Sequence, residues 1–294
     1  MNTAHEFIAQ LGEHLSMPAV YKEVRQLIEI KEASIDDFAD VIARDSMLKQ
    51  RMIRIANSPF FGFPRKANSL YQAISLIGIM QLHDLVLNSL CIRTLSNIPQ
   101  QIFDLRSFWI YSVECGIAAK AIAQQNRIIP NNHFFTFGLL HEVGHAAMYA
   151  REPELSLLAL EESKQNKCPL TQVEKHYFGF DYTEAGLALA QLWHLPEIYQ
   201  HVTAHHLTPE KAPSHYQQYM RILQLAHQLC QHLETDRLHN LINQFREMEP
   251  KRQQMPQNLI DLIYKDIQIH AEEVFQMLCP HGIQQHPPVA GQAP

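Results

Sequence analysis

Paired cysteines, long apolar runs and an excess of one charge are all missing from this sequence. Its five cysteines are widely and unevenly spaced and no Cys-x-x-Cys occurs, which argues against a disulfide framework and against a zinc ribbon. No uninterrupted apolar run approaches the ~18 residues of a membrane span. The first residues lack the basic segment and apolar block of a signal peptide. We therefore expect a reduced, cytoplasmic protein with no membrane partner.

The charge balance excludes a further class of partner. The formal net charge is −6, from 24 Lys and Arg against 30 Asp and Glu. No field of one sign results, so we expect no nucleic-acid partner. Hydrophobic residues make up 46% of the chain and charged residues 18%, which is typical of a globular protein rather than a disordered one. Histidine is abundant, with 18 residues, so mild acidification would move the net charge from negative to positive.

The distribution of apolar residues predicts an all-α protein. Apolar side chains recur at helical spacing, and no stretch shows sustained period-two alternation. Ser69 and Gln72 have the spacing of a capping box, and an apolar stripe follows them. Asp45 opens another helix, which must end near Asn57 because a residue before proline disfavours the helical region. Near the end of the chain, helices are predicted over roughly 214–233, 237–248 and 256–278.

An apolar run over 134–149, FFTFGLLHEVGHAAMY, holds three potential metal or acid/base groups: His141, Glu142 and His145. Its spacing predicts one buried or half-buried helix. Read as His-Glu-x-x-His, it would place two histidines on one helix face around Zn²⁺, with Glu142 as the base. Read as Gly-Leu-Leu-His-Glu, it resembles the signature of the HD metal-dependent phosphohydrolases, in which aspartate usually follows the histidine. A third interpretation is that these polar groups only satisfy buried neighbours.

Residues 45–88 carry a longer pattern. It begins with Asp, continues with Ala-Asn-Ser and Phe-Gly, and ends with Ser-Leu-x-x-Ala-Ile-x-x-Ile-Gly. This segment resembles the HDOD family, a non-catalytic relative of the HD metal-dependent phosphohydrolases that is found in bacterial signalling proteins. The likeness extends to about residue 235. The residues that match the family pattern are Asp45, Leu48, Ala56, Asn57, Ser58, Phe61, Gly62, Ser69, Leu70, Ala73, Ile74 and Gly78.

The second half resembles the HD pattern with its metal ligands altered. Tyr111 stands where the superfamily has its first histidine ligand, and a phenol is a poor ligand near neutral pH. His141 is kept, but Glu142 replaces the usual aspartate, and His227 falls where the closing aspartate is expected. The resemblance implies a remnant pocket lined by Tyr111, His141, Glu142, His145, Tyr182, His205, His206 and His227.

This altered pattern predicts no catalytic residue. Hard cations such as Mg²⁺ need carboxylate ligands, and the pattern has lost one ligand at Tyr111 and the closing aspartate at His227, while Glu142 is one methylene longer than the usual aspartate. We expect no tightly bound cofactor. The remaining polar residues either bind a divalent metal weakly, through His141, Glu142, His205 and His206, or form a buried hydrogen-bond network. A zinc protease is disfavoured, because no strand is evident to present a substrate and a helical lobe precedes the motif.

The expected architecture is an N-terminal helical lobe over residues 1–100 packed against a degenerate HD-like helical bundle over 101–235. C-terminal helices over 236–279 and a disordered tail over 280–294 follow. By resemblance, the protein has a regulatory role in signalling, through protein partners or a small ligand. A phosphohydrolase or phosphodiesterase with a rearranged metal site is the alternative. The sequence identifies neither the partner, the pathway nor the oligomeric state.

Overall fold

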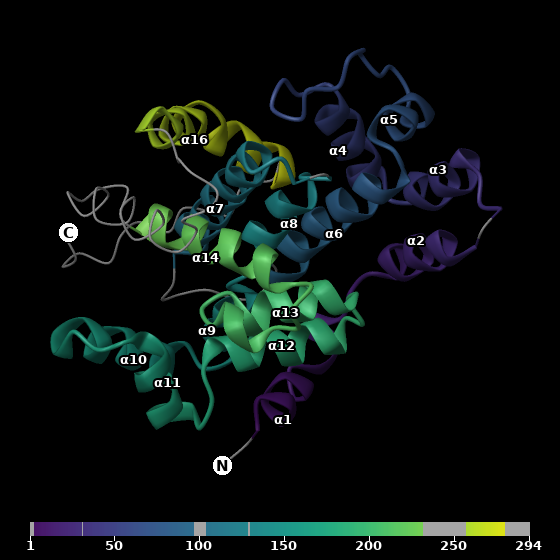
Figure 1. The fold of residues 1–294 in the computed structure, drawn as a ribbon. Helices are drawn as coiled ribbons and strands as arrows, with labels where there is room; N and C mark the ends of the chain where they lie inside the picture. Colours follow the sequence, from purple (N-terminus) through teal and green to yellow (C-terminus); the bar gives the residue numbers. More distant parts are fainter. Residues whose placement is uncertain (1–2, 31, 97–103, 129, 232–256, 280–294) are drawn as a thin grey trace.

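The computed structural model describes residues 3–30, 32–96, 104–128, 130–231 and 257–279, and within them every regular element is helical. The all-α prediction is confirmed (Figure 1). The first elements are α1 (Ala4–Ala9), η1 (Gly12–Leu15), α2 (Ala19–Glu29), α3 (Ile35–Ala43), α4 (Ser46–Ala56), α5 (Leu70–Ile77) and α6 (Ile79–Ser96).

The turn between α4 and α5 is held by one asparagine side chain. Asn57 Nδ2 donates to the Ala67 carbonyl at 2.9 Å, and Asn57 Oδ1 accepts from the Ala67 amide at 2.8 Å. Gly62 lies within this turn at φ +68°, which only glycine adopts without strain. Phe60 and Phe61 pack their rings on Phe135, 5.6 and 5.9 Å between centroids. The motif that resembles the family pattern therefore fixes a loop against the core.

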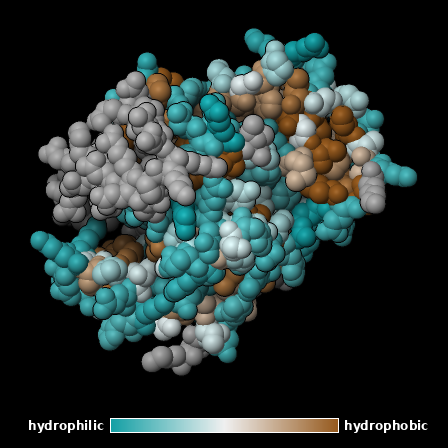
Figure 2. Space-filling view, in the orientation of Figure 1, coloured by the Kyte–Doolittle hydropathy of each residue, from teal (hydrophilic) through white to brown (hydrophobic). Residues whose placement is uncertain are grey.

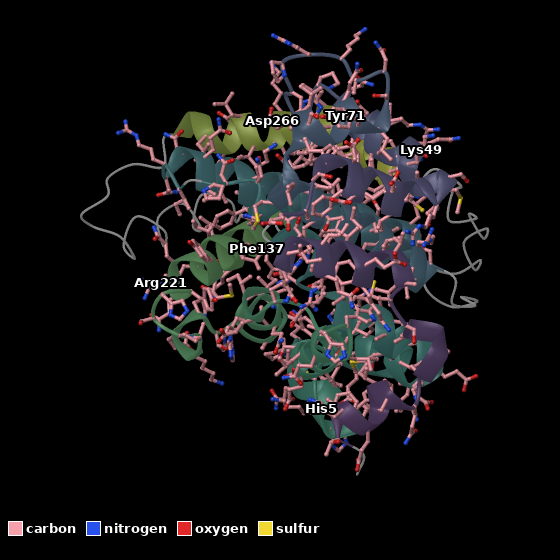
Figure 3. The ribbon with its side chains drawn as sticks, turned by 90° about the vertical axis from the view of Figure 1, so that its right-hand side faces the viewer. His5, Lys49, Tyr71, Phe137, Arg221 and Asp266 are labelled. Carbon is pink, nitrogen blue, oxygen red and sulfur yellow. The ribbon has the colours of Figure 1, made fainter. Side chains whose placement is uncertain are left out.

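The remaining helices begin with α7, on which several of them pack. They are α7 (Leu105–Gln125), α8 (His133–Leu140), α9 (Val143–Arg151), α10 (Pro153–Asn166), α11 (Leu170–Phe178), α12 (Tyr182–Leu192), α13 (Glu197–His205), η2 (Pro209–Lys211), α14 (Gln217–Gln231) and α16 (Gln257–Leu278). Helices α8, α14 and α16 all pack on α7, while α9 and α13 pack on α12. Figure 3 places Phe137 of α8 deep inside, and the side chain is 3% exposed. The core is therefore continuous along α7 and α8.

Helix α1 lies against α12, far from it in sequence (Figure 1). The Phe7 ring packs on the rings of Phe178 and Phe180, 6.0 and 5.1 Å between centroids. Trp193 Nε1 donates to the Leu15 carbonyl at 2.5 Å. The start of the chain thus packs on its second half, and the predicted lobe boundary at residue 100 stays a prediction.

At the other end of the chain, α16 covers α7. Arg106 Nη2 lies 2.7 Å from the Glu272 carboxylate, and Ile263 and Val274 are fully buried. The predicted helix over 237–248 and the predicted tail over 280–294 lie outside the described residues.

The prediction of one helix over 134–149 is wrong. The chain forms α8 up to Leu140, passes through His141 and Glu142, and starts again as α9 at Val143. The two halves pack on different partners, α8 on α7 and α9 on α12, so the chain changes course between them. Because both halves are buried, the apolar pattern runs through the break and hides it. His141 and His145 therefore do not share one helix face.

Two further observations concern exposed apolar side chains and the hydropathy of the helices. Figure 2 shows apolar side chains gathered over the N-terminal helices at the upper right. Among the exposed side chains of these helices, Tyr71 of α5 is 47% exposed and Met80 of α6 is 63% exposed. In the described part of the chain, no single helix has the length and hydropathy of a membrane span, although α5 and α6, bent by 112° at their junction, pass that test as a pair.

Candidate functional site

A chain of hydrogen bonds links three helices at the centre of the second half. Tyr111 Oη of α7 lies 3.0 Å from His227 Nδ1 of α14. The same Nδ1 lies 3.0 Å from Nε2 of His141, which follows α8. His141 Nδ1 lies 2.6 Å from the Gly138 carbonyl. All three histidine contacts are buried or half-buried, so the network is shielded from water.

The partners fix which nitrogen carries the proton. Gly138 offers a carbonyl, which only accepts, so His141 Nδ1 must donate and Nε2 must accept. His227 Nδ1 therefore donates to His141, and its Nε2 accepts from the Gln231 side-chain amide at 2.8 Å. Both imidazoles are neutral in this arrangement. The result is a directed chain of donors from Gln231 through His227 and His141 to Gly138.

A second pair adjoins this chain. Tyr182 Oη of α12 donates to His206 Nε2 at 2.9 Å, and His206 Nδ1 donates to the Val202 carbonyl at 3.0 Å. The His206 ring lies 5.1 Å from the His141 ring and 5.8 Å from the His227 ring, between centroids. We call Tyr111, His141, Glu142, Tyr182, His206 and His227 the histidine cluster.

His145 lies at the edge of the histidine cluster. Its ring stacks on Tyr182 at 3.8 Å between centroids. His145 Nδ1 is 3.1 Å from Glu174 Oε1, although the two atoms are not aligned as a hydrogen bond. Glu174 is 2% exposed, and its other oxygen accepts from the Tyr182 amide at 3.0 Å. Glu174 therefore connects the His145 ring to the start of α12.

Two glycines and one aspartate bring these helices together. A Cβ added to Gly138 would lie 2.3 Å from the amide nitrogen of Gly116, so α7 and α8 touch through their backbones. Gly144 approaches α12 in the same way. Asp181 caps α12 by accepting from the amides of Thr183 and Glu184, at 2.9 and 3.2 Å. These local features set the separation of the helices that carry the cluster.

Burial shifts the pKa values of several members of the histidine cluster toward their neutral forms. Burial lowers the pKa of His206 from its usual 6.5 to about 4. Burial, together with His206 and His227 nearby, holds the pKa of His141 well below 6.5. Burial also raises the pKa of Glu142 and of Tyr111 above their usual values. Only His145 goes the other way: burial disfavours its cation, but the carboxylates of Glu174, Glu142 and Asp181 outweigh burial and raise its pKa.

The structure gathers seven of the eight side chains that the sequence suggested for the pocket. His205 is the exception, because its ring stacks on His201 at 5.4 Å between centroids instead of facing His141. Cys115, Glu174 and Gln231 adjoin the cluster and were not anticipated. Cys115 stands four residues after Tyr111 and so shares its helix face, a spacing that could have signalled it. Nothing in the sequence marks Glu174.

The cluster does not fit the hard divalent cations of the HD phosphohydrolases. Such cations need several carboxylate oxygens. Glu142 is the carboxylate beside the two histidines, with Oε1 3.6 Å from His227 Nδ1 and 3.9 Å from His141 Nε2. The other donors are nitrogen, a phenol and the Cys115 thiol, and one atom each from Cys115, His141 and His227 lies within 4.8 Å of the others.

A second buried cluster lies between the two halves of the chain. Asp84 of α6 accepts from Tyr199 Oη, from His83 Nδ1 at 3.1 Å and from His133 Nδ1 at 2.5 Å. His83 Nε2 lies 3.2 Å from Tyr21 Oη of α2. Burial opposes the Asp84 charge, but its hydrogen bonds to His133 and His83 outweigh burial and lower its pKa. We call these five residues the aspartate cluster. It joins α2, α6, α8 and α13.

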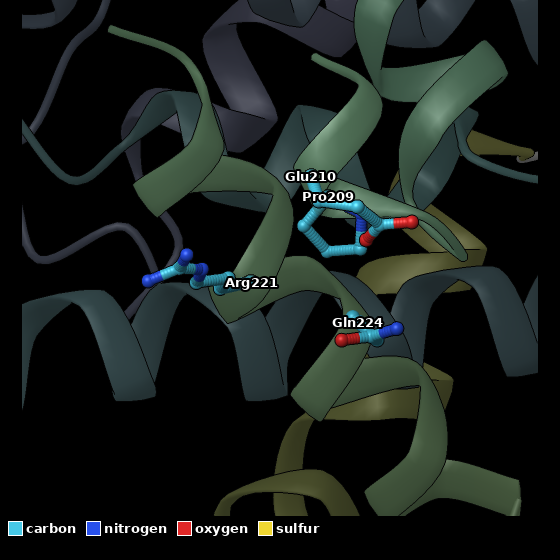
Figure 4. A pocket seen from close by; sticks show the side chains of 4 residues that line it. All are labelled: Pro209, Glu210, Arg221 and Gln224. Atoms are coloured by element: carbon cyan, nitrogen blue, oxygen red, sulfur yellow. The ribbon is translucent and has the colours of Figure 1, made fainter. Parts of the chain in front are cut away.

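A surface pocket of about 270 Å³ lies apart from the histidines. It is lined by Pro209 and Glu210 of η2 and by Arg221 and Gln224 of α14 (Figure 4). Gln224 Nε2 donates to the Leu207 carbonyl at 2.9 Å, which ties this wall to the end of α13. None of its lining residues belongs to the histidine cluster, so the pocket gives no direct access to the buried chemistry.

Comparison with known proteins gives one family and a set of related folds. The family model described as HDOD domain matches residues 15–209. A curated relative, an uncharacterized protein of Treponema pallidum (strain Nichols), is 22% identical over 248 residues, which are 83% of this chain and 45% of that protein. The chain thus spans less than half the length of this relative.

Solved structures share the fold. An HDOD domain protein of unknown function from Geobacter sulfurreducens has a TM-score of 0.74 at 20% identity, over 94% of this chain and 96% of that one. A protein from Shewanella amazonensis SB2B, named "Putative phosphohydrolase", has a TM-score of 0.72 at 20% identity, over 95% and 99%. A "Putative signal transduction protein" from Marinobacter aquaeolei VT8 has a TM-score of 0.66 at 18% identity, over 89% and 59%.

Proposed function

Because the chain belongs to the HDOD domain family, we propose that it is a regulatory protein of bacterial signal transduction that binds a protein or a small ligand and catalyses no reaction. The observation that carries the proposal is the hydrogen-bond chain through Tyr111, His227 and His141. These residues stand where the resemblance places the metal ligands of a hydrolase. A phenol and two neutral imidazoles hold each other there and supply no charge for a hard cation.

The relatives support this class without choosing a pathway. The Marinobacter aquaeolei protein is named for signal transduction and the Shewanella amazonensis protein for phosphohydrolase activity. Phosphoryl transfer by a metal-dependent hydrolase needs a cation that lowers the pKa of water and polarises the phosphoryl group. Glu142 is the one carboxylate that lies beside both His141 and His227, and it is insufficient for a pair of such cations. We therefore favour binding over hydrolysis.

The assay that tests the proposal measures hydrolysis of three classes of phosphoester in the presence of five divalent cations. The substrates are bis(p-nitrophenyl) phosphate, cyclic dinucleotides and nucleoside phosphates, each with Mg²⁺, Mn²⁺, Fe²⁺, Ni²⁺ and Zn²⁺ in turn. His141→Ala and Glu142→Ala are the controls, since a contaminating enzyme survives both changes. We expect no turnover that depends on either residue. Turnover of about 1 s⁻¹ or more that either change abolishes lies in the enzymatic range and would establish the hydrolase instead.

The same set of compounds tests binding. A ligand of the folded protein raises its melting temperature by mass action, at a concentration well above Kd. We expect a ligand of the histidine cluster to stabilise the wild type but not Tyr111→Ala, which removes the half-buried phenol at its edge. If no compound stabilises the wild type, the binding function falls to protein partners. The exposed Tyr71 and Met80 on the N-terminal helices are then the first positions to change.

A further inference from the structure

The thiol of Cys115 and the two central histidines form a compact donor set. One ligand atom from each of Cys115, His141 and His227 lies within 4.8 Å of the other two, and all three residues are buried. We propose that these side chains bind one borderline or soft divalent cation, represented by Zn²⁺, with the Glu142 carboxylate beside it. Such a site has a different ligand set from a hydrolase centre and is independent of the proposed signalling role.

His141 is oriented as metal ligands usually are, and His227 reaches the same arrangement when the Gln231 amide turns over. In metal sites, the nitrogen that does not bind the metal commonly donates to a carbonyl or another acceptor, which fixes the ring. His141 Nδ1 donates to Gly138 at 2.6 Å and leaves Nε2 facing His227. His227 Nε2 lies 2.8 Å from the Gln231 amide and leaves Nδ1 facing His141. A half-turn of that amide lets its oxygen accept from Nε2–H, so His227 Nδ1 can offer its lone pair.

The spacing of the donors suits a tetrahedral ion. Zinc bond lengths of about 2.0–2.3 Å place neighbouring donors about 3.3–3.8 Å apart. His141 Nε2 and His227 Nδ1 are 3.0 Å apart, and Glu142 Oε1 is 3.6 and 3.9 Å from them. Shifts of a few tenths of an ångström would bring the two histidines and Glu142 to coordinating distance. The Cys115 sulfur, which is grouped with the histidines but not with Glu142, would have to move farther. Cys115 supplies the sulfur, one helical turn beyond Tyr111 on the same face of α7.

The charges balance in this buried position. Zn²⁺ carries two positive charges, which one thiolate and one carboxylate neutralise, so no net charge is buried. Binding converts the Cys115 thiol into a zinc-bound thiolate and releases its proton to solvent, with no change in oxidation state. Thiolate and imidazole donors favour Zn²⁺ and Co²⁺ over Mg²⁺ and Mn²⁺. The donor set that fails for hard cations therefore fits a softer one.

The test uses the full chain, purified without a histidine tag, stripped with a chelator and kept reduced. Titration with Co²⁺ is expected to give one ion per chain, a thiolate-to-cobalt charge-transfer band in the near ultraviolet and the intense visible bands of tetrahedral cobalt. One equivalent of Zn²⁺ is expected to abolish these bands, and Mg²⁺ in excess to leave them unchanged. A wild type that takes up neither Co²⁺ nor Zn²⁺ at micromolar concentration would overturn the proposal, whatever the variants do.

Matched cysteine variants identify the sulfur. Cys115→Ser is expected to remove the charge-transfer band and to weaken Zn²⁺ binding by roughly a hundredfold or more. Cys91→Ser changes a thiol that is equally buried but lies on α6, and it is expected to keep both. Persistence of the band in Cys115→Ser would exclude this ligand set. Metal uptake without phosphoesterase turnover leaves the proposed function standing, and turnover without a thiolate band rejects both proposals, so the two can fail separately.

Discussion

Gly144 of α9 lies so close to α12 that a Cβ added to it would come within 1.9 Å of the Tyr182 carbonyl oxygen. This backbone contact is what allows the next residue, His145, to stack on the Tyr182 ring at 3.8 Å between centroids. Tyr182, the first residue of α12, donates in turn to His206, which directly follows α13. The positions of Tyr182 and His206 in the histidine cluster thus depend on the absence of a Cβ at Gly144.

Gly144→Ala is accordingly expected to destabilise the fold by about 3 kcal/mol or more, the upper range for inserting a methyl group into a packed core. The atom it meets is a backbone oxygen, which cannot rotate away. The control is Gly186→Ala, whose nearest contact is the Thr203 Cβ at 3.1 Å and which we expect to cost less. Urea unfolding measures both. Equal losses in the two variants would show that the α9–α12 contact can relax.

Helix positions were predictable because each depends on local signals. Ser69 accepts from the Gln72 amide at 3.2 Å and begins α5, as its spacing indicated. Asp45 likewise caps α4. The break at His141 was not predictable, because a hydrophobic pattern reports burial and both sides of the break are buried. The chain bends there because α8 and α9 pack on different helices, and the spacing of apolar residues does not specify which helix each one packs on.

The residues of the candidate site were also predictable only in part. The resemblance to HD proteins pointed to His141, His206 and His227, which do converge. It also suggested His205, whose ring faces His201 because neighbours on a helix differ by about 100° in direction. The aspartate cluster was missed altogether, since Asp84 and His133 belong to different helices and nothing local connects them.

Asp84→Asn should therefore cost about 3–5 kcal/mol, the usual loss when one partner of a buried charged network is removed. The amide keeps an acceptor but loses the charge that three donors share. We also expect the pKa of His133, now raised by its bond to Asp84, to fall on NMR titration. The control is Glu23→Gln, which breaks an exposed pair with Arg44 and is expected to cost less than about 1 kcal/mol. Similar losses would mean that Asp84 is solvated.

Core packing of the N-terminal helices gives a further prediction. Ile74 is 1% exposed on α5, and Ile74→Ala is expected to cost about 2–5 kcal/mol. Tyr71→Ala on the same helix, where the side chain is 47% exposed, is expected to cost far less. Denaturant midpoints at constant slope compare the two. An unchanged midpoint for Ile74→Ala would show that α5 turns a different face to the core.

The last prediction concerns pH and begins with His206. Its Nε2 accepts from Tyr182 and its Nδ1 donates to Val202, so a second proton has no acceptor and would displace the Tyr182 bond. Burial lowers the pKa from 6.5 to about 4. Between these values the unfolded chain binds the proton and the folded chain does not. Stability must therefore fall as the pH drops from about 6.5 toward 4, by about 3 kcal/mol for this one residue.

Other groups also change the stability in this range, some in the same direction and some in the opposite one. His141, whose pKa is also lowered, adds a loss of the same sign. His133 and His145 have raised pKa values, so their contribution is fully present below 6.5 and is lost only as the pH rises through their folded values. Glu142, with a raised pKa, opposes the histidines, because its folded form takes up a proton above the usual 4.5. A single wild-type curve is therefore not enough to isolate His206.

The comparison with His206→Gln isolates it. Glutamine has a side-chain oxygen that can accept from Tyr182 Oη, and it does not titrate, while every other titratable residue is kept. Urea unfolding at intervals from pH 7 to pH 4 gives the stability of each protein. We expect the wild type to lose about 3 kcal/mol relative to the variant across this interval, with most of the change below pH 6.5. Parallel curves would mean that the folded protein protonates His206 as readily as the unfolded chain does, and so that this ring is not sealed among the helices.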